Sequence, residues 1–132
     1  MVESEGEIRM WKWTELPRFA TFCRQICEKL DLEYEDEFDR IRWAIEEDVC
    51  RNPLTISHTD PRFNDEKRRF FRTAEAPAQT QVPPLVVIFR VVRYPEMGAK
   101  GVIEGREVWI EQELREIGFS LEPNGPSASA LA

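Results

Sequence analysis

The stretch Pro83-Pro84-Leu85-Val86-Val87-Ile88-Phe89-Arg90-Val91-Val92-Arg93-Tyr94 decides the fold of this chain. It is the longest apolar, β-branched run in the sequence, and two prolines precede it. A nearly continuous apolar run of this length is typical of a strand buried on both faces, so we expect it to be the central strand of a sheet. Arg90 is unusual there, because charged side chains are rare inside a buried strand.

Two amphipathic helices are predicted before this strand. Apolar side chains recur at spacings of three and four from Phe19 to Leu30, and Cys23 and Cys27 lie within that stripe as expected core residues. A second helix is predicted from Tyr34 to Cys50, and Asn52-Pro53 ends it, because the residue before proline is pushed out of the helical region. A short link between two such helices predicts an antiparallel helical hairpin.

Three further strands are predicted from local patterns. They cover Ile8–Trp13, Lys67–Thr73 and Arg106 to about Glu113, with a loose hairpin at Tyr94–Gly101 before the last. Alternation along the second of these strands gives two faces, one with Arg68, Phe70 and Arg72 and the other with Lys67, Arg69 and Phe71. In the central strand, the face with Leu85, Val87, Phe89, Val91 and Arg93 is bulkier, so we expect it to meet the helices.

Two residues outside these runs have local roles. Thr14 is a predicted N-cap of the first helix, because its hydroxyl suits the unpaired N–H groups there. Trp43 falls beside the apolar stripe of the second helix, and we expect it to cover an edge of the core.

The order strand, helix, helix and three strands predicts an α+β fold with two layers. In this fold an N-terminal strand and an antiparallel helical hairpin pack on a mostly antiparallel sheet of about four strands. We expect one domain over residues 8–114, a disordered tail over 1–7 and a mostly disordered tail over 115–132.

Composition excludes several functional classes. The chain has 132 residues, a net charge of −7 and 42% hydrophobic residues, values typical of a soluble protein with one core. It has no apolar run of membrane-spanning length and no apolar segment near the acidic N-terminus, so we expect a cytoplasmic protein with no membrane partner. Three cysteines and one histidine, His58 in a loop, do not make a metal ligand set, and no cofactor motif is present.

The charge is unevenly distributed along the chain. Residues 51–100 carry 9 basic and 5 acidic side chains, whereas the segments before and after them are both acidic. The middle of the chain is therefore a basic segment within an acidic protein, which is typical either of a local anion site or of strands paired with acidic neighbours.

The chain resembles the RelE/ParE superfamily of type II toxins at the level of pattern. The matching features are Asn52-Pro53 after the second helix, the basic strand Lys67–Thr73, the apolar strand Leu85–Val92 with its arginine, and the last strand Val108–Glu113. The resemblance implies a toxin, or a protein derived from one, that acts on mRNA at the ribosome or on gyrase and is held inactive by an antitoxin. RelE-like members are metal-independent endoribonucleases.

The resemblance also implies site residues. Cutting members use lysines and arginines on the sheet to orient phosphate and to stabilise its growing negative charge. By position, the candidate catalytic residues here are Lys67, Arg69, Arg72 and Arg90. A histidine or tyrosine transfers the proton in many members. Apart from the resemblance, His58 is a weak catalytic signal, because it is a lone loop histidine with no nearby cysteine, serine or second histidine.

Two alternatives remain open from the sequence. Arg68, Arg72 and Arg90 form an anion site, or they pair across strands with Glu107, Glu111 and Glu113 and need no ligand. The function also has two alternatives. A protein with this α+β fold is a toxin, or it is a non-catalytic protein-binding module that uses an exposed aromatic patch of Trp11, Trp13 and Trp109.

Overall fold

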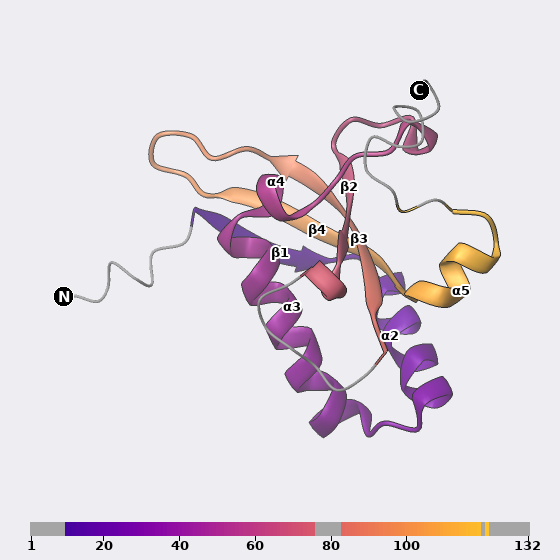
Figure 1. Cartoon of the computed structure of the whole chain (residues 1–132). Helices are drawn as coiled ribbons and strands as arrows, with labels where there is room; N and C mark the ends of the chain where they lie inside the picture. Colours follow the sequence, from indigo (N-terminus) through magenta and orange to yellow (C-terminus); the bar gives the residue numbers. More distant parts are fainter. Residues whose placement is uncertain (1–9, 76–82, 120, 122–132) are drawn as a thin grey trace.

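The computed structural model describes residues 10–75, 83–119 and 121. Eleven elements follow one another within these ranges (Figure 1). They are β1 (Trp11–Glu15), α2 (Pro17–Leu30), η1 (Tyr34–Phe38), α3 (Asp39–Arg51), α4 (Pro53–Ile56), η2 (Pro61–Phe63), β2 (Arg68–Arg72), η3 (Thr73–Glu75), β3 (Leu85–Arg93), β4 (Gly101–Ile110) and α5 (Glu111–Glu116).

The four strands form one mixed sheet in the order β1-β4-β3-β2. β1 runs parallel to β4, and the other two neighbouring pairs are antiparallel. α2 and α3 lie together along one side of the sheet (Figure 1). The predicted α+β fold is confirmed, with β3 in the interior of the sheet as its apolar sequence indicates.

The main core lies between the sheet and the two long helices. Alternate residues of β3 point toward the helices, and Leu85, Val87 and Phe89 are fully buried there. This is the predicted face, except that a register shift after Val91 places Arg93 opposite Val102, away from the main core. The helices contribute the predicted stripes, which include the buried residues Phe19, Cys23, Ile26 and Cys27 of α2 and Ile41, Ile45 and Val49 of α3. Burial raises the pKa of the Cys23 thiol to about 12, so it is protonated and unreactive.

A smaller apolar cluster covers half of the opposite face, which we call the helix-free face because the main core with α2 and α3 lies on the other side of the sheet. Its buried members are Phe70, Val86, Ile88, Leu114 and Leu121. α5 and the residues after it supply the last two. The other half of the helix-free face has no such cover and carries charged side chains.

Two predicted boundaries are wrong. β4 covers Gly101–Ile110, and Glu111 begins a helix instead of continuing the strand to Glu113. Gly101, the last residue of the predicted hairpin, lies in β4 together with Gly105, and the rings of Trp11 and Trp13 occupy the space that a side chain at these two positions would fill.

Two single-residue predictions are also wrong. Thr14 lies in β1, where its hydroxyl donates a hydrogen bond of 2.8 Å to the carbonyl oxygen of Ile103. Leu16 is the N-cap of α2, and Pro17 occupies its first turn. Trp43 is 64% exposed and does not cover the core, because it lies on the outer side of α3.

Candidate anion-binding site

The uncovered half of the helix-free face is a cluster of charged side chains. Strand register places Arg68 of β2 opposite Arg90 of β3, and Arg90 opposite Glu104 of β4. Arg106 is the bulge residue between Gly105 and Glu107, and its Nη1 lies 2.9 Å from Oε1 of Glu104. We call this group the basic half. It comprises Lys12, Arg68, Arg90, Arg106, Asp65 and Glu104.

Arg90 is held by a loop carboxylate. Its Nε donates to Oδ2 of Asp65 at 3.0 Å, and the other carboxylate oxygen accepts the backbone N–H of Lys67 at 2.9 Å. The hydrogen bond from the Lys67 backbone and then that from Arg90 lower the pKa of Asp65, so it stays ionised at neutral pH. Asp65 thus forms an ion pair with Arg90, and the charge of Arg68 also contributes to lowering the pKa of Asp65.

Arg68 makes no ion pair with any residue in the described ranges. Its Nε is buried and has no hydrogen-bond partner, and its guanidinium carbon lies 5.8 Å from the centroid of the Phe63 ring. Like charges directly opposite on neighbouring strands destabilise a sheet. The register places Arg68 and Arg90 in this relation, and Asp65 offsets part of their positive charge.

The four predicted site residues do not converge. Only Arg90 lies in the basic half. Arg69 belongs to the opposite face of β2, as alternation predicted, whereas Lys67 lies just before the strand begins. Arg69 holds the chain after α4, since its Nε donates to Oγ of Ser57 at 2.5 Å and its Nη2 donates to the carbonyl oxygen of Leu54 at 3.1 Å. Burial lowers the pKa of Arg69.

Arg72 shares the helix-free face but lies four residues from Arg68, about 13 Å along the strand. Its Nε and Nη2 donate to the two carboxylate oxygens of Glu111 at 3.1 and 3.0 Å, and its Nη1 lies 3.4 Å from Glu75. The predicted pairing with acidic residues near the last strand is thus found at Arg72. Arg90 instead pairs with Asp65, outside the predicted set of glutamates.

The Arg72–Glu111 pair gives a pH-dependent contribution to stability. Burial opposes ionisation of Glu111, but hydrogen bonds from Arg72 and Arg115 outweigh it and lower the pKa. A lowered folded-state pKa stabilises the fold above the unfolded value of about 4.3, and this stabilisation is lost as the pH falls through the folded value. We expect Glu111→Gln to lower the free energy of unfolding at pH 7 by about 1–2 kcal/mol.

Urea denaturation as a function of pH measures this effect. The difference between the wild type and Glu111→Gln is expected to shrink steadily below about pH 4.3 as the carboxylate is protonated. Glu113→Gln is the matched control, since Glu113 makes a more exposed pair with Lys29. A difference at pH 7 that persists unchanged in acid would contradict the ion-pair explanation.

His58 belongs to the Arg72 end of the face. Its backbone pairs with Phe70 at the outer edge of β2, and its Nε2 lies 3.1 Å from Oε1 of Glu75. The imidazole ring also packs on the Phe70 ring, with 5.3 Å between centroids. This arrangement gives His58 an architectural role.

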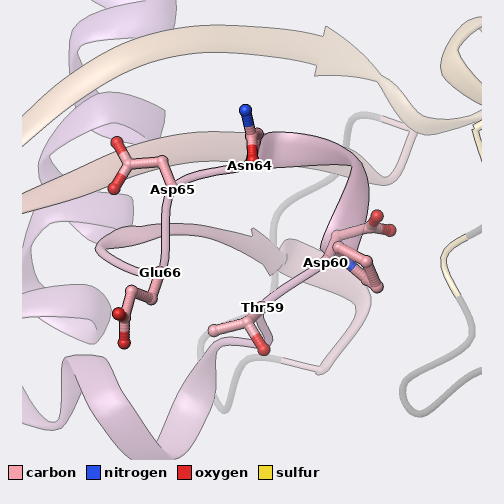
Figure 2. A pocket seen from close by; sticks show the side chains of 6 residues that line it. Thr59, Asp60, Asn64, Asp65 and Glu66 are labelled. Atoms are coloured by element: carbon pink, nitrogen blue, oxygen red, sulfur yellow. The ribbon is translucent and has the colours of Figure 1, made fainter.

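A shallow hollow of about 590 Å³ lies beside the basic half, in the loop before β2. It is lined by Thr59, Asp60, Pro61, Asn64, Asp65 and Glu66. Figure 2 shows that the carboxylates of Asp65 and Glu66 point away from each other and that Asp60 lies on the far side of the loop. The carboxylates therefore do not converge on a cation. Within the described ranges, no group of three or more histidine, cysteine or acidic residues is arranged to hold a metal ion.

The predicted aromatic patch is not formed. Trp11 is only 8% exposed, and the ring of Trp13 packs edge-on against Phe19 with 5.8 Å between centroids. Trp109 is partly buried against Phe22, and its indole N–H donates to Glu107 at 2.9 Å. These residues serve the core and its edges.

Sequence reasoning missed most of the basic half as a site. Alternation places Arg68 and Arg90 on definable faces of their own strands, but it does not give the register that sets them opposite each other. Asp65 lies in a loop of no recognisable motif. Arg106 joins the group through a β-bulge that the sequence pattern does not predict.

The fold and this cluster together define an α+β protein with a candidate anion-binding face on its sheet. The chain matches no protein-family profile, no curated protein and no solved structure. In the part of the chain that the structure describes, no helix combines the length and apolar character needed to cross a membrane.

Proposed function

We propose that this protein is a RelE/ParE-like toxin, or a protein derived from one, that acts in the cytoplasm on mRNA at the ribosome or on gyrase. Its basic half would bind the phosphate groups of the nucleic acid. The observation that carries the proposal is the Arg68–Arg90 pair, in which two arginines lie directly opposite each other on β2 and β3 and Asp65 forms an ion pair with Arg90. An antitoxin partner belongs to the same proposal.

Two features support this function. The element order strand, helix, helix and three strands agrees with the pattern on which the resemblance rests. Paired guanidinium groups also suit phosphodiesters, because each can donate two parallel hydrogen bonds to phosphate oxygens.

Binding and cleavage require different groups. The arginines of the basic half would stabilise negative charge that grows on a phosphate during cleavage, without a metal. A proton-transfer group must also lie within hydrogen-bond reach of the attacked phosphate. The carboxylates nearest the pair, Asp65 and Glu104, already accept hydrogen bonds from Arg90 and Arg106. We therefore propose phosphate binding by the arginines first. Metal-independent cleavage is a further proposal, which also requires a proton-transfer group.

The first test is binding of a short fluorescent single-stranded RNA at two salt concentrations. We expect Arg90→Glu to weaken binding at least about tenfold and to reduce its salt dependence, because a phosphate contact is lost. Arg40→Glu makes the same charge change on α3, where Arg40 pairs with the exposed Asp36, and is expected to bind as the wild type does. Asp65→Asn is expected to bind more tightly, because Arg90 loses its internal partner.

The second test is growth on induced expression. Wild-type protein is expected to arrest growth and Arg90→Glu to relieve the arrest, with equal amounts of soluble protein. Cleavage of mRNA on programmed ribosomes and inhibition of gyrase supercoiling separate the two targets. RNA binding that is unaffected by Arg90→Glu, or expression without any growth defect, would overturn the proposal.

A further inference from the structure

The two edges of the sheet differ in how their backbone groups are used. At the β2 edge, Phe70 exchanges two backbone hydrogen bonds of 2.9 Å with His58, so this edge is covered. At the other edge lies β1, and no strand or isolated bridge of the described residues pairs with its outer side. An open edge of this kind is a template on which a further strand can pair.

The parallel register shows which backbone groups of β1 face outward. The N–H of Gly101 donates to the carbonyl oxygen of Met10 at 2.8 Å, and the N–H of Leu16 donates to the carbonyl oxygen of Gly105 at 3.0 Å. The even-numbered residues of this segment therefore direct their N–H and C=O groups toward β4. The alternate residues, whose backbone groups face the open side, are Trp11, Trp13 and Glu15.

We propose that the chain forms a symmetric dimer in which β1 pairs antiparallel with β1 of a second copy. The two-fold axis would pass beside Trp13, so that Trp13 meets its own copy and Trp11 meets Glu15. Every outward-facing residue of β1 then belongs to a pair that exchanges both of its backbone hydrogen bonds. The sheets of the two copies would join into one continuous sheet through an interface that uses the same surface on both.

The side chains on the other face of β1 complement their own copy in this register. Lys12 stands opposite Thr14 of the second copy, so no like charges meet across the interface. Met10, which is 56% exposed, stands opposite Leu16 of the second copy and gains an apolar neighbour. This self-complementarity favours a second copy of the chain over an unrelated strand as the occupant of the edge.

The one acidic side chain of β1 is already neutralised within its own chain. The carboxylate of Glu15 accepts hydrogen bonds from Nη2 of Arg42 at 2.7 and 2.9 Å and from the indole N–H of Trp13 at 2.8 Å. Glu15 can therefore stand opposite Trp11 of the second copy without bringing an unpaired negative charge to the interface.

The neighbouring registers are less favourable. A shift of the axis to Lys12 sets that lysine directly opposite its own copy, and like charges in this position destabilise the pairing. A shift to Thr14 sets Trp11 opposite Pro17, which has no backbone N–H to donate. The sequence of the edge thus selects the register centred on Trp13.

Pairing of the two edges would also join the two helix-free faces. Lys12 lies on that face within the basic half, so the basic halves of both copies would lie on one continuous surface. Such a surface can contact a longer stretch of phosphates than either copy alone. This consequence rests on the proposed function, whereas the pairing of β1 does not.

Sedimentation velocity over a range of protein and salt concentrations tests the dimer. Each copy carries a net charge of −7, so we expect salt to screen the repulsion and to lower the Kd of the dimer. Thr14→Lys sets lysines opposite each other and is expected to raise the Kd at least about threefold. Lys12→Thr combined with Thr14→Lys restores a lysine opposite a threonine and is the matched control, with an expected Kd equal to that of the wild type.

Disulfide cross-linking tests the register. Lys12→Cys and Thr14→Cys place thiols at positions that lie opposite each other in the proposed pairing. In oxidised glutathione, an equal mixture of the two proteins is expected to form linked dimers. Each protein alone is not, because diagonal positions are about 7–8 Å apart. The native cysteines are buried, and the wild type measures their background reaction.

The remaining outcomes decide against stated parts. A chain that stays monomeric at every concentration would overturn the proposal and leave the edge to an extended segment of another protein. A dimer that Thr14→Lys does not weaken, or linkage of Lys12→Cys alone, would overturn pairing at β1 in this register. A dimer that binds no RNA would overturn the proposed function alone, and a monomer that binds RNA would overturn the dimer alone.

Discussion

Phe89→Ala is expected to lower the free energy of unfolding by about 3–5 kcal/mol, the largest stability effect of any change considered for this protein. Phe89 is fully buried in the interior strand β3 and packs in the core shared with α2 and α3. Truncation removes most of the buried apolar area of this side chain and leaves a cavity. β3 is held between two neighbouring strands and covered on both faces, so it cannot shift to fill that cavity. Urea denaturation followed by far-UV circular dichroism measures the loss.

The control for this prediction lies on the same strand. Val92→Thr changes a side chain that is 41% exposed at the end of β3, and we expect it to alter stability by no more than about 0.5 kcal/mol. A loss below about 1 kcal/mol for Phe89→Ala would show that the β3 side chains do not form the main core.

Gly101→Ala is expected to cost about 1–3 kcal/mol, although it adds a single methyl group. An added Cβ would lie 2.5 Å from Cε3 and 2.7 Å from Cζ3 of Trp11, and 2.9 Å from Cδ of Pro95. Trp11 is itself buried and packs edge-on against Tyr94, so its ring has little room to move. Thermal and urea unfolding of the purified variant measure the cost.

A double-mutant cycle identifies the cause of that cost. If the clash with the indole ring is responsible, Gly101→Ala combined with Trp11→Leu will destabilise by at least about 0.5 kcal/mol less than the sum of the two single changes. Strict additivity would contradict the clash and indicate that Gly101 is needed for another reason.

The same contact bears on the candidate site. Trp11 pairs with Gly101 in the parallel register of β1 and β4, and its ring lies over the glycine on the helix side. Because side chains alternate along a strand, this places Lys12 on the helix-free face, within the basic half. A variant that disturbs this contact is therefore expected to weaken RNA binding as well as stability.

The sequence determined the α+β fold through local periodicity. The apolar run of β3 requires cover on both faces, and the stripe from Phe19 to Leu30 supplies a helix that covers one of them. These patterns are properties of neighbouring residues, so they can be recognised without any knowledge of distant contacts. For the same reason, alternation along β2 correctly assigned Phe70 and Phe71 to opposite faces.

Tertiary structure decided which charged groups meet. Arg72 and Arg90 lie on the same face of the sheet through the β2–β3 register, yet Glu111 pairs with the first and Asp65 with the second. Arg68 stands opposite Arg90 because the β2–β3 register brings together residues far apart in the chain. Register depends on side-chain packing over both faces and on the lengths of the connections, which are non-local quantities. The sequence therefore determined that the sheet carries arginines, and only the folded chain determined that two of them lie directly opposite each other.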